Sequence, residues 1–225
     1  MPNSPNLKSQ LVFRFLTAFG TVALMLFLPA DSLAYWQAWL YLAIVFIPMA
    51  LGSIYFYRTD QNLVARRLQT REKVSEQGAI IRLARLVFFA ALLLPGFDYR
   101  FGWSHLPLWA TVSSQALVLA GLLITSWVMA TNSFASRIIE VSPGQRVIST
   151  GPYRWVRHPM YFGAIVVLLC TPLALGSYWA LPAFALVIPF IVLRLLGEER
   201  ILRRELPGYA EYCQRTRFRL VPLLW

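Results

Sequence analysis

Gly151-Pro152-Tyr153-Arg154-Trp155-Val156-Arg157-His158-Pro159-Met160-Tyr161 is the stretch where turn-forming and ionisable residues meet a long apolar run. Its Gly-Pro pair turns the backbone, and Pro159 is typical of the first turn of a helix, where a backbone N–H is not needed. The stretch therefore predicts a helix that starts near Pro159 with a basic cluster at its N-terminus, a position that attracts anions. A basic collar at a membrane surface would explain the arginines alone. His158 and Tyr161, three residues apart, indicate a functional site.

The rest of the chain is apolar enough to be an integral membrane protein. Of its 225 residues 58% are hydrophobic and 14% are charged, and the mean hydropathy is +0.56. Uncharged runs of about 20 residues are too long for the core helices of a soluble protein and indicate membrane spans. We therefore predict an all-α polytopic membrane protein with about six transmembrane helices, at residues 11–30, 34–57, 79–97, 108–131, 159–175 and 178–196.

The distribution of positive charge predicts the orientation of these helices. The formal net charge of +11 does not indicate a nucleic-acid partner, because the basic residues follow the loops between the spans. With six spans and a cytoplasmic N-terminus, 20 of the 21 Lys and Arg residues lie on the cytoplasmic side and only Arg100 lies outside. We expect the polar ends of the last three spans, and thus the active site, to face the cytoplasm.

The sequence divides into two regions. Residues 1–131 form a four-span region, in which a short interfacial helix is expected at 63–68 and the Pro95-Gly96 pair is expected to end the third span. Residues 132–225 contain a connector of about twenty residues, a hairpin of the last two helices and a cytoplasmic tail. A connector of this length in a compact protein is usually functional or a lid.

Unusual polar residues gather at the cytoplasmic ends of the last three spans. Glu198 and Glu199 are the only adjacent acidic pair in the chain. Near the C-terminal end of a helix they face an unfavourable dipole, so at least one should have a partner outside its own helix. No metal site is expected, because His158 has no second histidine nearby and neither Cys170 nor Cys213 belongs to a pair.

In order along the chain, these residues resemble the isoprenylcysteine carboxyl methyltransferase and phospholipid methyltransferase family. The Gly-Pro-Tyr-Arg-x-x-Arg-His-Pro-x-Tyr-x-Gly pattern of 151–163 is similar to the family's signature. It is followed by Glu198-Glu199, a Tyr-x-x-Tyr tail at 209–212 and a closing Pro222, and preceded by Asn132-x-Phe134. The resemblance covers residues 130–225, while the first four spans resemble the family only in hydropathy. The tail, with Arg217 and Arg219, is more basic than that of eukaryotic members.

The resemblance implies S-adenosylmethionine as methyl donor, bound between the membrane helices and the cytoplasmic tail. The residues carried over as its binding site are Asn132, Arg157, His158, Tyr161, Glu198, Glu199, Tyr209 and Tyr212. Their chemistry suits this cofactor, because cations hold its carboxylate, a carboxylate bonds its ribose and aromatic rings flank its adenine. Arg217 and Arg219 are candidates to clamp an anionic acceptor. Methyl transfer to a carboxylate then depends mainly on alignment and exclusion of water.

Three other functions are considered beside carboxyl O-methylation of an isoprenylcysteine-like or other amphiphilic acceptor. Phospholipid N-methylation shares the cofactor site but needs a general base, for which Glu199 is the candidate. A sterol-reductase-like enzyme would use NADPH, for which only the arginine cluster offers a phosphate site. A non-catalytic transporter or scaffold would need charged residues inside the spans, which are nearly free of them.

Overall fold

The computed structural model describes residues 5–69, 75–136, 138–139, 141–221 and 224–225, and in this part of the chain every regular element is a helix. The all-helical membrane fold predicted from the sequence is thus confirmed. The helices are α1 (Pro5–Ala30), α2 (Trp36–Thr59), α3 (Gln61–Leu68), α4 (Ser75–Phe101), α5 (Leu108–Thr131), the 3-10 helix η1 (Gly151–Arg154), α6 (Pro159–Ala174), α7 (Leu181–Ala185), α8 (Ile188–Glu205) and α9 (Tyr209–Arg215).

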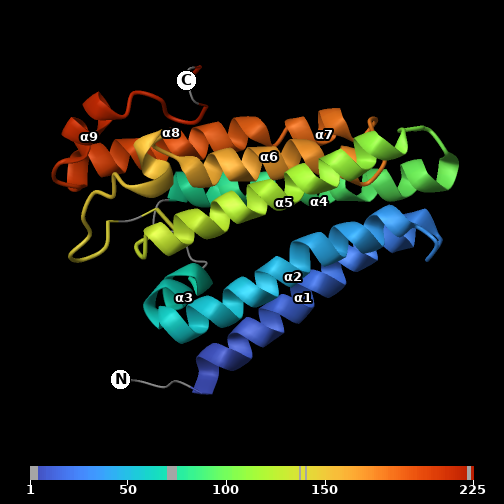
Figure 1. The fold of residues 1–225 in the computed structure, drawn as a ribbon, viewed down its shortest axis with the longest axis horizontal. Coiled ribbons are helices and arrows are strands. Elements are labelled where there is room, and N and C mark those ends of the chain that lie inside the picture. Colours follow the sequence, from blue (N-terminus) through green and yellow to red (C-terminus); the bar gives the residue numbers. More distant parts are fainter. Residues whose placement is uncertain (1–4, 70–74, 137, 140, 222–223) are drawn as a thin grey trace.

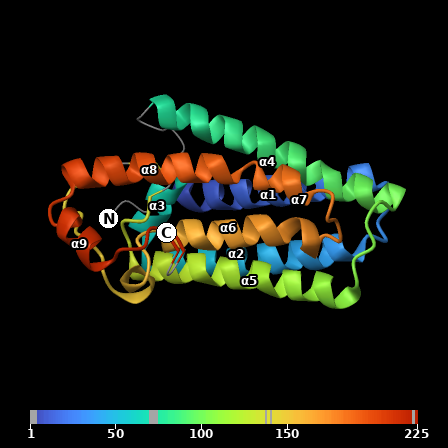
Figure 2. The ribbon, with the colours of Figure 1, turned by 90° about the horizontal axis from the view of Figure 1, so that it is seen from above.

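Five of these segments are long and apolar enough to cross a membrane: α1, α2, α4, α5 and the combined α7–α8 segment. The remaining expected span, α6, is apolar but has only 16 residues. At 1.5 Å per residue it is about 24 Å long, less than the roughly 30 Å of the hydrocarbon core. It lies directly beside α5, as Figure 2 shows.

The third span does not end at Pro95-Gly96, so this prediction was wrong. Helix α4 continues through the pair to Phe101 and crosses α1 there. A Cβ at Gly96 would lie 2.5 Å from Pro29 Cγ and 2.6 Å from the carbonyl oxygen of Leu26. Gly96 therefore permits close contact with α1, and this packing outweighs the helix-breaking tendency of the pair.

The second of the last two expected spans is interrupted close to a proline. The polypeptide between 178 and 196 is not one continuous helix, because α7 ends at Ala185 and α8 starts at Ile188, one residue before Pro189. Helix α6 packs most closely on α5, whereas α7 and α8 pack on α4 (Figures 1 and 2). As expected, α8 continues through Glu198 and Glu199 beyond the apolar run.

Glycines hold α5 and α6 at close range. A Cβ at Gly163 would lie 2.8 Å from the carbonyl oxygen of Gly121 and 3.0 Å from Thr125 Oγ1. Membrane helices associate through such small residues, because there is little hydrophobic driving force between helices in lipid. Since Gly163 is only two residues after Tyr161, this contact also fixes the start of α6 relative to α5.

Replacing Gly163 by alanine should therefore destabilise the protein by about 1–3 kcal/mol, the usual cost of overpacking a well-packed interface. The nearest neighbour, the Gly121 carbonyl oxygen, is backbone and cannot rotate away. The matched control is Gly52→Ala, in the middle of α2, where a Cβ would meet nothing within 4 Å. Thermal unfolding in detergent checks the pair, and equal melting temperatures for both variants would contradict close packing of α5 on α6.

One end of the bundle carries the polar elements. Helices α3 and α9 and the connector after α5 gather there (Figure 1). The predicted short helix at 63–68 is present as α3, and Asp60 caps it by accepting a 2.8 Å hydrogen bond from the Leu63 N–H. At the opposite end Arg100 pairs with Asp31 at 3.4 Å.

Candidate functional site

The stretch that opens α6 folds as the sequence predicts. Gly151 adopts a φ of +58°, a conformation that favours glycine, and helix α6 begins at Pro159. Between them the chain places Tyr153 inwards, while Arg154 and Trp155 are exposed and Arg157 and His158 are buried. The motif therefore has one side that faces solvent and one side that faces the protein.

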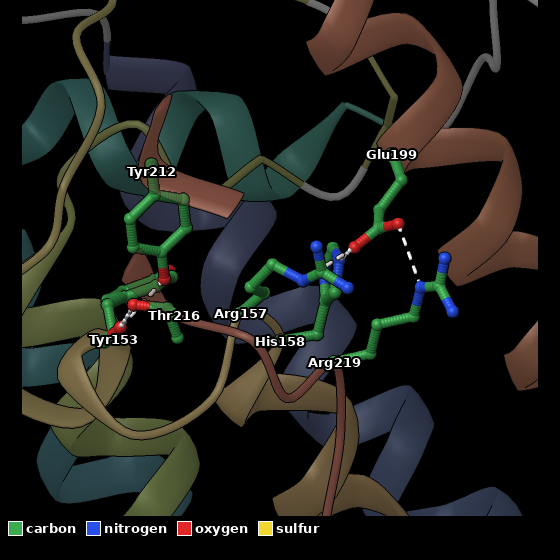
Figure 3. Close-up of polar contacts among 7 residues, drawn as sticks. All are labelled: Tyr153, Arg157, His158, Glu199, Tyr212, Thr216 and Arg219. Atoms are coloured by element: carbon green, nitrogen blue, oxygen red, sulfur yellow. Dashed lines mark hydrogen bonds and ion pairs between the residues drawn. The ribbon is translucent and has the colours of Figure 1, made fainter. Parts of the chain in front are cut away.

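Tyr153 joins the end of α5 to the C-terminal tail. Its hydroxyl accepts a 2.9 Å hydrogen bond from Asn132 Nδ2, and its carbonyl oxygen accepts one of 2.7 Å from the Tyr212 hydroxyl. Thr216 Oγ1 lies 3.5 Å from the same carbonyl (Figure 3). Burial raises the pKa of Tyr153 to about 12; Asn132 and Arg67 oppose the rise and Glu198 adds to it. The hydroxyl is therefore a neutral donor and acceptor at physiological pH.

Glu199 is the centre of a buried ionic cluster (Figure 3). Its Oε1 lies 3.0 Å from Arg157 Nε and 3.4 Å from His158 Nε2, and its Oε2 accepts a 3.0 Å hydrogen bond from Arg219 Nε. The side chains of Glu199 and Arg157 are 4% and 5% exposed. These partners come from outside α8, which confirms the expectation that one of the two glutamates has a partner beyond its own helix.

The tail after α9 runs along the motif. The backbone N–H of Arg157 donates to the Phe218 carbonyl, and that of His158 donates to the Arg219 carbonyl, both at 2.9 Å. Arg219 also packs over the Trp225 ring, with 5.4 Å from its guanidinium carbon to the ring centroid. The tail is thus fixed to the motif by backbone and side-chain contacts.

A cavity of about 270 Å³ lies between this motif, the connector, α8 and α9. Seven of the eight residues carried over as cofactor-binding line this cavity: Asn132, Arg157, His158, Tyr161, Glu198, Tyr209 and Tyr212. The eighth, Glu199, does not line it. Neither Arg217, which is exposed, nor Arg219 lines it. Pro222 lies outside the described residues.

Glu198 and Tyr209 are polar residues of this lining. The Tyr161 hydroxyl donates a 2.7 Å hydrogen bond to Glu198 Oε2. Tyr209 is 5% exposed, and its hydroxyl has no hydrogen-bond partner among the described residues. Burial raises the pKa of Tyr209 well above its usual value, so the hydroxyl keeps its proton. A buried hydroxyl without a partner is costly, so a bound water or ligand is expected to supply one.

Sequence reasoning missed several residues of the lining. They are Arg67 of α3, Arg194 of α8 and the connector residues Gln145 and Arg146, beside Tyr153. Tyr153 belongs to the quoted signature and was therefore accessible from the sequence. Arg194 is one helical turn before Glu198, which places both on one face of α8. Nothing in the sequence pointed to Arg67, which is far away along the chain.

Comparison with known proteins matches part of the chain to one family and finds several relatives. Residues 114–205, from α5 to the end of α8, match the isoprenylcysteine carboxyl methyltransferase family. The chain is 25% identical over 180 residues to the uncharacterized protein YpbQ of Bacillus subtilis, covering 73% of this chain and 96% of that protein. It is 24% identical over 186 residues to protein-S-isoprenylcysteine O-methyltransferase B of Arabidopsis thaliana, covering 73% of this chain and 87% of the plant enzyme.

A shorter match concerns a different enzyme. The chain is 31% identical over 91 residues to the Delta(14)-sterol reductase TM7SF2 of Mus musculus, which covers 39% of this chain and 22% of the reductase. This match is confined to part of both proteins, whereas the plant methyltransferase matches over most of its length. Together the comparisons identify a membrane methyltransferase.

Proposed function

We infer that this chain, a membrane methyltransferase of the isoprenylcysteine carboxyl methyltransferase family, uses S-adenosylmethionine to methylate the carboxylate of an amphiphilic acceptor. The observation that carries the inference is the unpartnered Tyr209 hydroxyl beside Glu198 in one cavity. When bound, S-adenosylmethionine supplies an activated methyl group, and a carboxylate acceptor needs no proton removed. The protein then has to align the acceptor and exclude water.

The residues of the cavity fit this cofactor. Arg157 and His158, at the N-terminus of α6, suit the carboxylate of its amino-acid part. The carboxylate oxygens of Glu198 can accept hydrogen bonds from the ribose hydroxyls. The Tyr209 hydroxyl can donate a hydrogen bond to, or accept one from, a polar group of the cofactor. The tyrosine rings at 153, 209 and 212 provide aromatic surface for the adenine.

Phospholipid N-methylation is supported less well. A protonated amine must lose its proton before it can accept a methyl group, which requires a base at the cavity. Glu199, the base considered from the sequence, does not line the cavity and is engaged by Arg157, His158 and Arg219. Glu198 would have to take that role, although it already accepts the Tyr161 hydrogen bond.

The cavity is proposed to face the cytoplasm. Its lining comes from α3, α8, α9 and the connector, whose polar ends gather at one end of the bundle (Figure 1), whereas Arg100, near the end of α4, pairs with Asp31 at the other end. By the positive-inside rule the arginine-rich end is cytoplasmic. A water-soluble cofactor would then reach Tyr209 from the cytoplasm.

Titration of the purified protein with S-adenosylmethionine, S-adenosylhomocysteine and NADPH tests the function. The two adenosyl compounds should raise the melting temperature, because a ligand at 100 times its Kd stabilises the folded state by about 2.7 kcal/mol. Stabilisation by NADPH alone would favour the reductase instead.

Tyr209→Phe should weaken binding of S-adenosylmethionine by about 2- to 13-fold, the effect of one hydrogen bond, without lowering the melting temperature. The ring stays, and no protein hydrogen bond among the described residues is lost. Tyr212→Phe is the matched variant, because it removes the bond to the Tyr153 carbonyl and should instead reduce stability. Calorimetry and thermal unfolding separate the two effects. Tighter or equal binding by Tyr209→Phe would place the cofactor elsewhere.

A further inference from the structure

The cavity joins two different apolar clusters, and this gives it two distinguishable ends. At one end the aromatic cluster of Leu206, Tyr209 and Tyr212 packs with the connector residue Val147. At the other end the cavity reaches Ala135 and Met160, which belong to a cluster with α3 and with the adjoining ends of α1 and α2. If the proposed function holds, the aromatic end suits the cofactor, and the α3 end remains for the acceptor.

The α3 end has the composition that an amphiphile requires. Its cluster contains Phe56 at the end of α2, Leu63 and Val64 of α3, and Leu7 and Leu11 near the start of α1. Phe56, Leu63 and Val64 are buried, so the cluster supports the residues Ala135 and Met160, which belong to it and line the cavity. Ala135 and Met160 give this end of the cavity an apolar lining, against which an amphiphile can pack beside its polar head.

Helix α3 is held firmly in this place. Asp60 caps its N-terminus, and Leu63 and Val64 are 1% and 5% exposed. Arg66 donates from its guanidinium to the Ser133 carbonyl in the connector, and Arg14 of α1 donates to the Leu68 carbonyl at 2.7 Å. Because α3 is anchored on both sides, its other arginine is presented at a defined position.

That arginine, Arg67, lines the cavity and lies 3.5 Å from Met160 through its Nη1. The described lining contains Arg67, Arg146, Arg157 and Arg194 but only one carboxylate, Glu198, so the cavity attracts anions. Arg67 is the cationic side chain contributed at the α3 end.

We propose that Arg67 of α3 is a specificity-determining residue, whose guanidinium pairs with the carboxylate of the methyl acceptor at the α3 end of the cavity. This inference rests on the proposed function. It adds a residue that binds the methyl acceptor and belongs to the N-terminal region 1–131, outside the matched region 114–205. It replaces Arg217 and Arg219 as acceptor clamp, since neither lines the cavity. An arginine suits a carboxylate because two of its N–H groups can bond both oxygens.

The test compares three amphiphiles with the same farnesyl chain and different heads: N-acetyl-S-farnesylcysteine with a free carboxylate, its neutral methyl ester, and S-farnesylcysteamine with an amine. Binding to the protein saturated with S-adenosylhomocysteine is measured by calorimetry in one detergent. The parent should bind the carboxylate more tightly than the ester and the amine. In Arg67→Gln the preference for the carboxylate should fall by about 10- to 150-fold, the effect of losing a hydrogen bond to a charged group.

Two further variants make the result specific to this side chain. Arg58→Gln removes the same charge from the last turn of α2, next to α3 in the chain, but its exposed side chain does not line the cavity, so the preference for the carboxylate should remain. Arg67→Lys should recover part of it. The proposal is overturned if Arg58→Gln and Arg67→Gln lose the preference equally, or if the parent binds the three heads alike or the amine best.

Binding of S-adenosylhomocysteine to each variant separates this proposal from the proposed function. We expect its Kd to change less than twofold in Arg67→Gln. A parallel loss of cofactor affinity would place Arg67 at the cofactor end, which overturns the acceptor assignment but leaves cofactor binding in the cavity intact. Failure of the parent to bind the cofactor at all would instead reject the proposed function.

Discussion

Replacing Glu199 by alanine should lower the free energy of unfolding by about 3–5 kcal/mol, the cost of removing one partner from a buried ion pair. Its carboxylate lies 3.0 Å from Arg157 Nε, and both side chains are almost fully buried. Without Glu199, the Arg157 guanidinium would stay inside the protein with its charge uncompensated. The loss is large because the desolvated charge remains, rather than because the pair itself is strongly stabilising.

The substitution should also release the tail. Arg219 reaches Glu199 Oε2 at 3.0 Å, and the backbone next to it bonds to Arg157 and His158. Trypsin should therefore cut after Arg215, Arg217 or Arg219 faster in Glu199→Ala than in the parent. Thermal unfolding in detergent and the cleavage rate are measured on the same preparations.

Glu205→Ala is the control for this prediction. Glu205 lies at the end of the same helix and pairs with Arg204, but its side chain is 42% exposed. Exposed ion pairs contribute about 0–1 kcal/mol, so this variant should unfold close to the parent. Similar melting temperatures for Glu199→Ala and Glu205→Ala would mean that the cluster around Glu199 is not a structural centre.

The distinct environments of Glu198 and Glu199 illustrate what the sequence could not decide. Adjacent residues of an α-helix point about 100° apart, so one can face a cavity while the other faces the tail. Which one does so depends on how α8 is rotated against α4, α6 and α9, and this rotation is a property of the whole bundle. The sequence could only predict that one of them has a partner outside the helix.

Local signals were sufficient for much of the fold. The start of α6 at Pro159, the short helix α3 and the extension of α8 follow from proline position, amphipathic pattern and charge. The end of α4 was mispredicted because Pro95-Gly96 acts locally as a breaker, whereas the contact of Gly96 with Pro29 is tertiary. Arg67 was missed for the same reason, since its approach to Met160 joins residues 93 positions apart.

His158 provides the largest expected effect on cofactor binding. Its side chain is 4% exposed, it lines the cavity, and its Nε2 lies 3.4 Å from Glu199. If it holds the cofactor, alanine leaves a buried partner unsatisfied at a cost of about 1–3 kcal/mol. Binding of S-adenosylmethionine by His158→Ala should then be weaker by about 5- to 150-fold.

Arg154→Ala is the control for this prediction. Arg154 belongs to the same motif, one turn earlier, but its side chain is exposed and does not line the cavity, so we assign it to lipid headgroups. The Kd for S-adenosylmethionine and the melting temperature of each variant are measured in the same detergent. The melting temperature is needed because His158 also contacts Glu199, and a partly unfolded protein would bind the cofactor weakly. His158→Gln, which keeps a polar side chain, should recover part of the affinity. If both alanine variants bind like the parent, the cofactor does not occupy this cavity; if Arg154→Ala is the weaker binder, the cofactor lies on the exposed side of the motif.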